Sequence, residues 1–236
     1  ALFCRSNGTF ERLGHLQNLP LPGGDAAARE PWRMAVAAAL TAECRRAAIA
    51  LWPQRPVAAM LSLASNPRLT STTSSAGRLF DAVSAIAGLC DEQNDEAQAA
   101  MLLEAAGGDF ADASCEEDDF VVTQESGLNV LQVTALLQRL FAMRLEGRTS
   151  QAISIRFHAA FSAGMAKLAA ECFPAGATVC LSGGTFLNRF VAADLSRRLR
   201  QMGYRTYLSS LLPPGDGAIS FGQCAVARQR LDAATH

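Results

Sequence analysis

Two turns in the last quarter of the chain contain residue types that suit the binding of a phosphate group together with a cation. Residues 182–188 read SGGTFLN, and residues 213–217 read PPGDG. Glycine lets another molecule approach the backbone closely, and the first N–H groups of a helix attract anions. Asp216 adds a carboxylate, and magnesium in proteins is bound by a few carboxylates together with phosphates and water. The two turns therefore predict a site for a phosphate group and a divalent cation.

Each turn joins a predicted strand to a predicted helix. Residues 178–181 and 204–208 are short apolar segments typical of buried strands, and helical periodicity follows in residues 185–202 and 217–232. In an open α/β sheet, ligands bind at the carboxyl edge of the strands. We therefore expect both turns to lie at one sheet edge, with Asp216 facing the glycines of the first turn.

The same residues also suit a purely structural role. Asn188 is a good helix-capping residue, and a pair of glycines forms a sharp turn without any ligand. Asp216 can cap the last helix, and PPGDG has the composition of an ordinary turn. A ligand site and two structural turns are both consistent with these segments taken alone.

The middle of the chain is predicted to be helical, and we expect an α/β protein with a helical subdomain beside a small α/β lobe. Apolar residues recur at helical spacing in six segments: 31–51, 55–65, 71–90, 94–108, 129–146 and 150–173. Residues 1–24 are expected to be irregular or short strands, and the acidic run 116–119 is expected to be a solvated loop. The predicted division is a mainly helical part, residues 1–177, and a C-terminal α/β part, residues 178–236.

Composition and charge argue against several classes of protein. Of the 236 residues, 50% are hydrophobic and 18% are charged, which is typical of a globular chain. The net charge of −1 disfavours binding to nucleic acid or to a membrane surface, and no apolar run reaches the ~18 residues of a spanning helix. Seven scattered cysteines without C-x-x-C spacing predict reduced thiols in a cytoplasmic protein. The first ten residues lack the apolar segment of a signal peptide, and we expect them to come from inside a longer multidomain protein.

Six segments of the chain, in this order, resemble the hydrogenase maturation carbamoyltransferase family HypF. They are ERLGHLQNLPLPGGDAAAREPWRMA (11–35), TSSAGRLFDAVSAIAGL (73–89), EAQAAMLLE (96–104), ISIRFHAAFSAGMAKLA (153–169), LSGGTFLNRF (181–190) and LPPGDGAISFGQ (212–223). The resemblance covers nearly the whole chain and corresponds to the C-terminal part of the family's transferase domain.

The resemblance implies the fold of actin, Hsp70 and the sugar kinases, a ribonuclease H-like ATPase lobe. It also implies a reaction in which carbamoyl phosphate and ATP yield carbamoyl-adenylate. The carbamoyl group then passes to the C-terminal cysteine of the partner protein HypE, and later becomes a cyanide ligand of the iron in nickel–iron hydrogenase. A divalent metal ion is implied as a cofactor, and the sequence does not distinguish magnesium, iron and zinc.

The resemblance assigns roles to individual residues in the last quarter of the chain. Gly183 and Gly184 match glycines that accept the phosphate or ribose of the nucleotide. Asn188 matches an asparagine that contacts the nucleoside. Asp216 matches a carboxylate that reaches the metal ion.

Two further nucleotide-binding candidates lie in the helical part. Asp81 matches a position that binds ribose, although from the sequence alone it simply pairs with Arg78, three residues earlier. Ala97 stands where relatives can have a glycine whose backbone approaches the sugar. Residues 23–25 match a recurrent motif of the family that we place on the wall of the site.

His158 lies among apolar residues on a helix and is predicted to be a core histidine rather than a catalytic one.

The resemblance also implies parts that these 236 residues do not contain. The family carries an acylphosphatase-like domain, zinc-finger modules and a YrdC-like adenylate-forming domain before this region. The first half of the transferase domain is expected to hold a metal-binding H-x-x-x-H pair, which His15, His158 and His236 cannot form. We therefore expect this piece to be inactive alone. Two other functions stay open: a different enzyme on the same fold, such as a threonylcarbamoyl or O-carbamoyl transferase or a sugar kinase, or a non-catalytic module that docks HypE.

Overall fold

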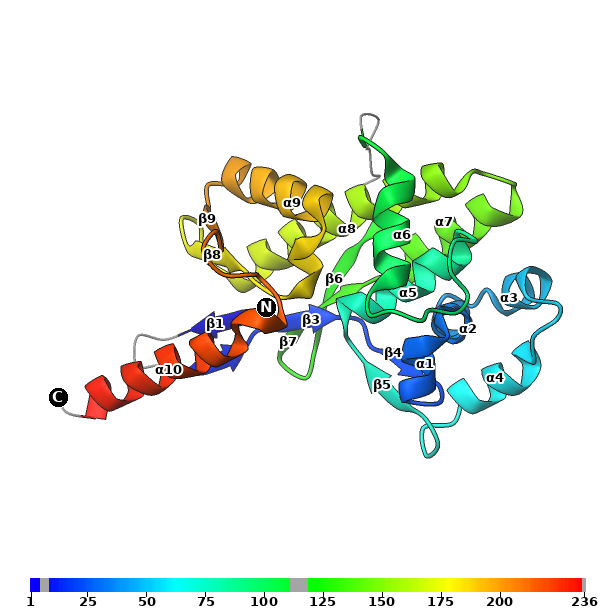
Figure 1. Ribbon diagram of the computed structural model, residues 1–236, viewed down its shortest axis with the longest axis horizontal. Helices are drawn as coiled ribbons and strands as arrows, with labels where there is room; N and C mark the ends of the chain where they lie inside the picture. The colour runs from blue at the N-terminus through cyan, green and yellow to red at the C-terminus, as the bar shows by residue number, and fades with distance from the viewer. Residues whose placement is uncertain (5–8, 111–118, 235–236) are drawn as a thin grey trace. The chain divides into compact units, whose positions relative to one another are not determined.

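The computed structural model of the protein describes residues 1–4, 9–110 and 119–234. The chain forms two compact units, each assembled from segments that are not consecutive: residues 1–15, 122–131 and 162–236 in unit 1, and residues 16–121 and 132–161 in unit 2. Helices and strands occur in both units, and this mixture confirms the predicted α/β class (Figure 1). The predicted division separates the chain at one point, after residue 177, whereas each unit described here combines several segments. The predicted division stays a prediction.

Unit 1 contains short strands and two helices near the carboxyl end of the chain. Its strands, wholly or for the most part, are β1 (Leu2–Cys4), β2 (Phe10–Arg12), β3 (Gly14–Leu16), β6 (Val121–Glu125), β7 (Leu128–Gln132), β8 (Thr178–Leu181) and β9 (Arg205–Leu208). Its helices are α9 (Arg189–Gln201) and α10 (Ile219–Ala234), preceded by the 3-10 turns Gly184–Leu187 and Asp216–Ala218. Helix α8 (Ser150–Cys172) begins in unit 2 and ends in unit 1.

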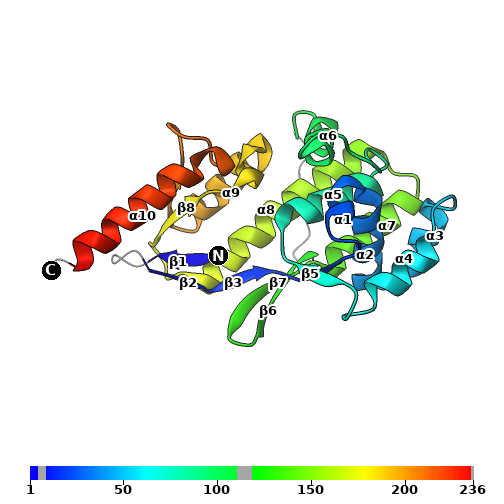
Figure 2. The same ribbon diagram turned by 60° about the horizontal axis from the view of Figure 1, so that its bottom comes forward.

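The parallel pair β8–β9 is the part of unit 1 that positions the two glycine turns. Thr178 pairs with Arg205 and Leu181 pairs with Leu208, so the two strands have their carboxyl ends on the same side. Helix α9 packs against this pair (Figure 2). Seven buried residues form their core: Ala166, Ala169, Val179, Leu181, Leu195, Leu199 and Tyr204. Both predicted strands are therefore confirmed, and their bounds agree with the prediction to within one residue.

Helix α10 has no buried residue from Ile219 to Asp232. Phe221 and Leu231 are large apolar residues of this helix, and their exposed fractions are 63% and 70%. Figure 1 shows the helix extending away from the β8–β9 pair. The predicted helix is present, but it contributes nothing to the core of its unit.

Unit 2 is mainly helical. Its helices are α1 (Asp25–Arg29), α2 (Pro31–Thr41), α3 (Arg45–Leu51), α4 (Val57–Ala64), α5 (Ala76–Ile86), α6 (Gln98–Gly107), α7 (Thr134–Leu145) and the first half of α8. One antiparallel pair of strands accompanies them, β4 (Leu19–Leu21) with β5 (Ser71–Thr73).

Helices α2 and α5 make an extensive contact in unit 2. Helix α2 begins at Pro31, which suits a first helical position because its missing N–H would have no partner there. The run from Met34 to Ala39 on this helix is fully buried, and four of its six residues are alanines. Alanine side chains are small, so the backbones of the two helices approach closely and the interior stays densely packed.

The segment predicted as one helix over residues 31–51 is two helices. Helix α2 ends at Thr41, and α3 begins at Arg45. Between them Glu43 has a φ of 58°, in the left-handed region, which ends a right-handed helix. The prediction was wrong here because no glycine or proline marks the break.

The helix predicted over residues 129–146 begins later, at Thr134. Residues 128–132 form β7 instead, which follows β6 and lies between β6 and β3 in a three-stranded sheet. Ser126 and Gly127 join the two strands with φ values of 51° and 82°. Two successive positive φ values are the geometry of the tight hairpin turns that fit strand twist, and a Ser-Gly pair can adopt them.

The acidic run 116–119 was predicted to be a solvated loop. Residues 116–118 lie outside the described residues, and the prediction is wrong for Asp119. The Asp119 side chain is only 1% exposed and lies 2.6 Å from Arg156 Nη2 and 3.3 Å from Arg139 Nε. These arginines belong to α8 and α7, so the carboxylate ties two helices together at the start of the segment that leads into β6.

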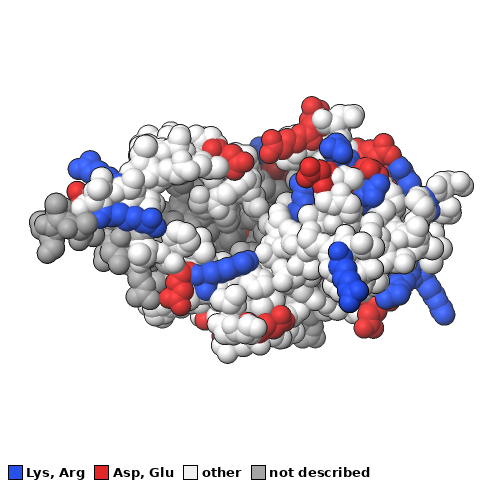
Figure 3. Space-filling view, turned by 90° about the horizontal axis from the view of Figure 1, so that it is seen from below, with Lys and Arg blue, Asp and Glu red and all other residues white. Residues whose placement is uncertain are grey.

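Charged side chains of both signs are interspersed on the face seen in Figure 3, without one continuous basic patch. That face therefore offers no stripe of positive charge for a nucleic-acid backbone. Within the described residues, each helix is too short or too polar to cross a bilayer.

We predict that Arg156→Met lowers the free energy of unfolding by about 3 kcal/mol, because it leaves the buried Asp119 carboxylate without its nearest charge partner. Arg139→Met is the matched control. Its side chain is 43% exposed, so water screens the pair and the loss should stay below about 1 kcal/mol. Urea unfolding followed by circular dichroism measures both. Equal losses in the two variants would contradict the prediction.

Candidate functional site

The first glycine turn follows β8 directly and is shaped by Gly183. This residue has a φ of 111°, which side-chain-bearing residues rarely adopt. Its N–H donates a hydrogen bond of 2.6 Å to the carbonyl oxygen of Pro214, and the Ser182 hydroxyl donates to the same oxygen at 3.3 Å. The backbone of the first turn is therefore tied to the second turn.

The two turns are in van der Waals contact. A Cβ atom placed on Gly215 would lie 3.5 Å from the Cα atom of Gly184. On the other side of the first turn, a Cβ atom on Gly183 or Gly184 would meet nothing within 4 Å. The structure therefore brings the two predicted turns together at the carboxyl end of β8–β9, with open space in front of two exposed glycines.

Asn188 lies between the 3-10 turn and helix α9, and it is buried. Its side-chain oxygen accepts a hydrogen bond of 3.0 Å from the N–H of Val191, so it caps the helix. The helix-capping role predicted for Asn188 is therefore confirmed. A contact between Asn188 and a nucleoside stays a prediction.

Asp216 is exposed at the start of the second 3-10 turn. Within residues 1–4, 9–110 and 119–234, its carboxylate takes part in no hydrogen bond or ion pair, so it does not cap the last helix. The same residues contain no group of three metal-binding side chains. Asp216 alone fits one position around a divalent cation, and the remaining ligands would have to come from elsewhere.

Asp81 lies on α5 and is almost completely buried, with an exposed fraction of 1%. Its carboxylate lies 2.8 Å from Arg78 Nη1, so the helix pair expected from the sequence is present. Burial raises the pKa of Asp81 to about 6, while Arg78 and a hydrogen bond with Gln93 oppose this rise. A buried carboxyl group with a raised pKa is a frequent feature of functional sites, and the ribose contact of Asp81 stays a prediction.

Ala97 precedes helix α6 and has a φ of 60°, the left-handed conformation that glycine adopts more easily. The residue is exposed, so its backbone is accessible. Ala97 and Asp81 both belong to unit 2, whereas the two glycines, Asn188 and Asp216 belong to unit 1. The six candidates are thus divided between the two units, four in unit 1 and two in unit 2.

His158 is fully buried, as expected for a core histidine. Its Nδ1 lies 2.8 Å from the carbonyl oxygen of Ser154, and its ring meets those of Phe80 and Phe110 edge to face. Burial lowers the pKa of His158 to about 4. The imidazole is therefore neutral near pH 7 and belongs to the aromatic core.

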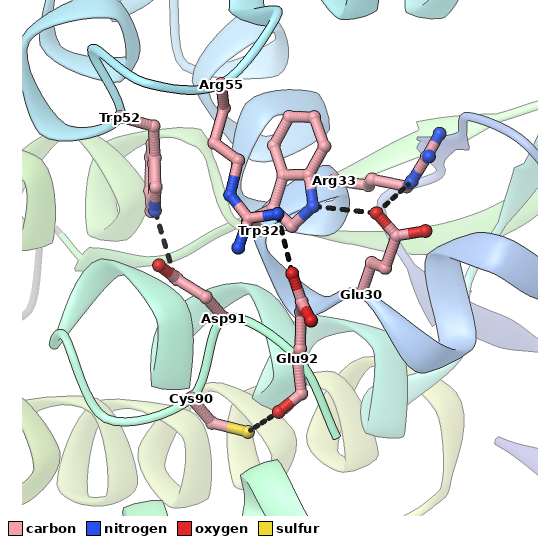
Figure 4. A network of polar contacts seen from close by, with 8 residues as sticks. All are labelled: Glu30, Trp32, Arg33, Trp52, Arg55, Cys90, Asp91 and Glu92. Atoms are coloured by element: carbon pink, nitrogen blue, oxygen red, sulfur yellow. Dashed lines mark hydrogen bonds and ion pairs between the residues drawn. The ribbon is translucent and has the colours of Figure 1, made fainter. Parts of the chain in front are cut away.

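Sequence reasoning missed a network of polar contacts around Trp32 (Figure 4). Trp32 Nε1 donates to Glu30 at 2.9 Å, and the guanidinium carbons of Arg33 and Arg55 each lie 5.4 Å from the centre of its ring. The family motif at residues 23–25 adjoins this network, since a Cβ atom on Gly23 would lie 3.2 Å from Arg33 Nη1. Some of these contacts join residues dozens of positions apart, so spacing along the chain gave no signal.

A family profile described as "Carbamoyltransferase, Kae1-like Domain, second subdomain" matches residues 1–223. The chain is 40% identical over 238 residues to the "Carbamoyltransferase HypF homolog" of Cupriavidus necator, covering 94% of this chain and 59% of that protein. It is 41% identical over 224 residues to "Carbamoyltransferase HypF" of Rhizobium leguminosarum bv. viciae, covering 93% of this chain and 28% of that protein. The chain therefore spans less than two thirds of either relative.

Solved structures agree with this similarity. The structure described as "full-length HypF in the phosphate- and nucleotide-bound form" superimposes with a TM-score of 0.83 at 29% identity, covering 98% of this chain and 30% of that one. The HypF of T. kodakarensis superimposes with a TM-score of 0.73 over 95% of this chain and 31% of that one, and its 23% identity supports the fold alone.

We predict that Ala97→Gly raises the free energy of unfolding by about 0.5–1 kcal/mol, because glycine adopts a left-handed conformation without the steric cost that alanine incurs. Ala100→Gly, one turn into the same helix, is the control. It should lower stability by about 1 kcal/mol, the ordinary cost of glycine inside a helix. Thermal unfolding measures both signs. A loss of stability in Ala97→Gly would show that the left-handed conformation is not a source of strain.

The raised pKa of Asp81 predicts a pH-dependent stability. The folded protein keeps this carboxyl protonated to higher pH than the unfolded chain does. Its contribution is therefore fully present below pH 3.8 and is lost as the pH rises through about 6. One pKa unit corresponds to about 1.4 kcal/mol, so the loss is roughly 3 kcal/mol.

Asp81→Asn cannot titrate and should lack this loss. Urea unfolding of wild type and variant at pH 4 and pH 7 measures the difference, and the other titrating groups contribute equally to both proteins. If the two proteins change in stability by the same amount between these pH values, the Asp81 carboxyl does not titrate as stated.

Proposed function

The chain belongs to the HypF family of carbamoyltransferases, as the second subdomain of their Kae1-like domain, and on this basis we propose that it supplies part of a carbamoyl-transfer site. In the proposed reaction, carbamoyl phosphate and ATP are first converted to carbamoyl-adenylate in another domain of the longer protein. The residues of this chain bind the adenylate. The carbamoyl group then passes to the C-terminal cysteine of HypE, for maturation of the cyanide ligands of nickel–iron hydrogenase.

The observation that carries this proposal is the contact between the two glycine turns at the carboxyl end of β8–β9. The turns place exposed backbone at Gly183 and Gly184 close to the second turn, which carries the exposed carboxylate of Asp216. The Gly183 N–H is bonded to Pro214, so the N–H of Gly184 and the Asp216 carboxylate form the combination that phosphate oxygens and a cation need. A solved relative with 29% identity is described as phosphate- and nucleotide-bound, which supports assigning a nucleotide to this chain as well.

In the transfer step, the thiolate sulfur of the acceptor cysteine forms a bond to the carbamoyl carbon. The bond between that carbon and the phosphate oxygen breaks, and AMP departs with the electron pair. The turn formed by Gly183 and Gly184 would hold the phosphate group, with the N–H of Gly184 as the donor because that of Gly183 is bonded to Pro214, and Asp216 would hold a divalent cation beside it. Such a cation, when bound, neutralises the charge that develops on the departing phosphate.

The nucleoside is assigned to the remaining candidates. Asn188 of unit 1 would contact it from the start of α9. In unit 2, the resemblance separately assigns a ribose contact to Asp81 and to the backbone of Ala97. Asp81 is covered by Arg78 in this structure, so a ribose hydroxyl would have to compete with that arginine for the carboxylate. This competition is plausible chemically because both partners donate hydrogen bonds to the same oxygen atoms.

A non-catalytic docking role for HypE is the second candidate, and exposed apolar side chains around the turns favour it. Leu187, Leu211 and Phe221 have exposed fractions of 63%, 94% and 63%. Apolar surface of this kind is often covered by another protein surface. A module that only docks HypE would tolerate the loss of the Asp216 charge, so the experiment below separates the two functions.

We predict that Asp216→Asn in the full-length protein lowers the rate of carbamoyl transfer to HypE by about 10²–10³, because loss of a preorganised charge partner at a developing anion commonly costs this much. Formation of carbamoyl-adenylate, measured as pyrophosphate release, should be nearly unchanged, since the proposal places it in another domain. Transfer is followed by mass spectrometry of the HypE C-terminal peptide.

Asp232→Asn is the matched control for this experiment. It removes another exposed carboxylate of unit 1, near the end of α10, and should leave the transfer rate unchanged. The melting temperature of both variants should stay near that of wild type, because neither carboxylate is buried. Transfer at the wild-type rate by Asp216→Asn would overturn the proposed metal-binding role and favour docking.

A further inference from the structure

A hollow of about 570 Å³ opens on the surface of unit 2, between the turn that joins α2 to α3 and the side of α7. The buried residues Ala47 and Phe141 line it together with Leu145, whose exposed fraction is 55%. Helices α3 and α7 are in contact with each other, so both walls belong to one compact unit. The hollow therefore offers an apolar surface to a group that enters from solvent.

The shape of this hollow depends on the break between α2 and α3. The left-handed conformation of Glu43 turns the chain there, with a φ of 58°. The carbonyl oxygen of Ala42 accepts a hydrogen bond of 3.1 Å from Gln138 Nε2 and one of 3.3 Å from the Cys44 thiol. Because Gln138 lies on α7, its hydrogen bond ties the turn to the opposite wall.

Two arginines line the hollow without a charge partner. Arg45 and Arg46 are exposed, and in the part of the chain that the structure describes neither takes part in an ion pair or a side-chain hydrogen bond. They lie in the first turn of α3, which contains no acidic residue, and the helix dipole disfavours cations in that turn. The carboxylate of Glu43 lines the hollow as well, but it pairs with neither arginine. The hollow thus carries an excess of positive charge that does not stabilise the helix bearing it.

We propose that this hollow docks an acidic peptide segment of a partner protein, with one large apolar side chain next to carboxylates. The apolar side chain packs against Phe141 and Leu145, and the carboxylates pair with Arg45 and Arg46. An acidic segment complements the charge of the hollow, whereas a basic segment would meet two guanidinium groups that lack partners. None of the six candidate residues for carbamoyl transfer lines the hollow, so this surface is independent of the proposed reaction.

The openness of the hollow favours a peptide over a free small molecule. Most of its lining residues are exposed, so it covers an occupant on one side only. Sites for small molecules usually enclose most of the ligand surface. A side chain of a longer segment does not need such enclosure, because contacts on either side of it hold the segment in place.

The test tethers short peptides beside the hollow of the full-length protein. Ala142→Cys places a thiol at an exposed position of its wall. The probes are tripeptides with an N-terminal mercaptopropionyl group, and the first contains phenylalanine followed by two glutamates. Three others replace both glutamates with glutamines, both glutamates with lysines, or the phenylalanine with alanine. Disulfide exchange in excess 2-mercaptoethanol reaches equilibrium, and mass spectrometry of non-reduced peptides gives the tethered fraction at each cysteine.

We expect the probe with phenylalanine and glutamates to tether about fivefold more than the glutamine probe, since two exposed ion pairs are worth about this much. It should tether about tenfold more than the alanine probe, because the hollow buries part of the aromatic side chain. The exposed thiols of Cys180 and Cys224 are internal controls and should show neither preference.

The double variant Arg45→Gln/Arg46→Gln, in the Ala142→Cys background, should lose the preference for glutamate and keep the preference for phenylalanine. Arg29→Gln/Arg68→Gln is the matched control, because it removes two exposed arginines of unit 2 that do not line the hollow. It should keep both preferences. The melting temperatures of these variants should stay near that of wild type, since all the substituted side chains are exposed.

Several results would overturn the proposal. Stronger tethering of the lysine probe would make the hollow a site for a basic segment, through Glu43. Equal tethering of the phenylalanine and alanine probes would show that no apolar side chain enters the hollow. A preference for glutamate that survives the loss of Arg45 and Arg46, or that is equally strong at Cys180 and Cys224, would show that these arginines do not select the ligand.

Discussion

The close packing of α2 against α5 is the contact on which unit 2 depends. The buried run from Met34 to Ala39 consists mainly of alanines, and it faces a helix whose residues from Leu79 to Ile86 are all buried. A larger side chain in this run would push the helices apart, because the interior has no space to absorb it. Asp81 lies on the same buried stretch of α5, so the helix packing that stabilises the unit also takes its carboxyl group out of water.

Two residues, one in each unit, show how a structural and a functional interpretation of the same side chain can coexist. Asn188 caps a helix, and Asp81 pairs with Arg78, as their sequence contexts suggest. Neither interaction excludes a role in ligand binding, because Asn188 follows the exposed glycine turn directly and a donor of a ligand can share a carboxylate or amide oxygen that already has one partner. Local stability and ligand contact then depend on the same few residues. The effect of a substitution at these positions therefore has to be measured on both stability and ligand affinity.

Much of the fold was predictable where local signals were strong. The strands at 178–181 and 204–208 and the two glycine turns were located from apolar segments and turn residues, and the structure brings the turns into contact. The hairpin at Ser126–Gly127 could have been predicted from its Ser-Gly pair, which can form a tight turn between two strands. The break at Glu43 had none, because its left-handed conformation depends on the packing of the helices on either side.

The candidate site was predictable only in part, for a physical reason. Backbone turns can be recognised in a sequence from glycine and proline, whereas the partners of Gln93 and Asp119 come from distant segments. Burial of Asp119 could not be inferred from a run of acidic residues, which ordinarily remains in water. Such contacts are decided by tertiary packing, and a single sequence carries no spacing that reveals them.

Helix α10 adds a consequence for local stability. A helix whose described side chains, from Ile219 to Asp232, are all exposed gains little from packing, and most helical stability in proteins comes from packing of one face. All of its residues from Ile219 to Asp232 are exposed, so the core of unit 1 does not protect them. Its backbone amides should therefore exchange with solvent deuterium far faster than those of α2 or α5.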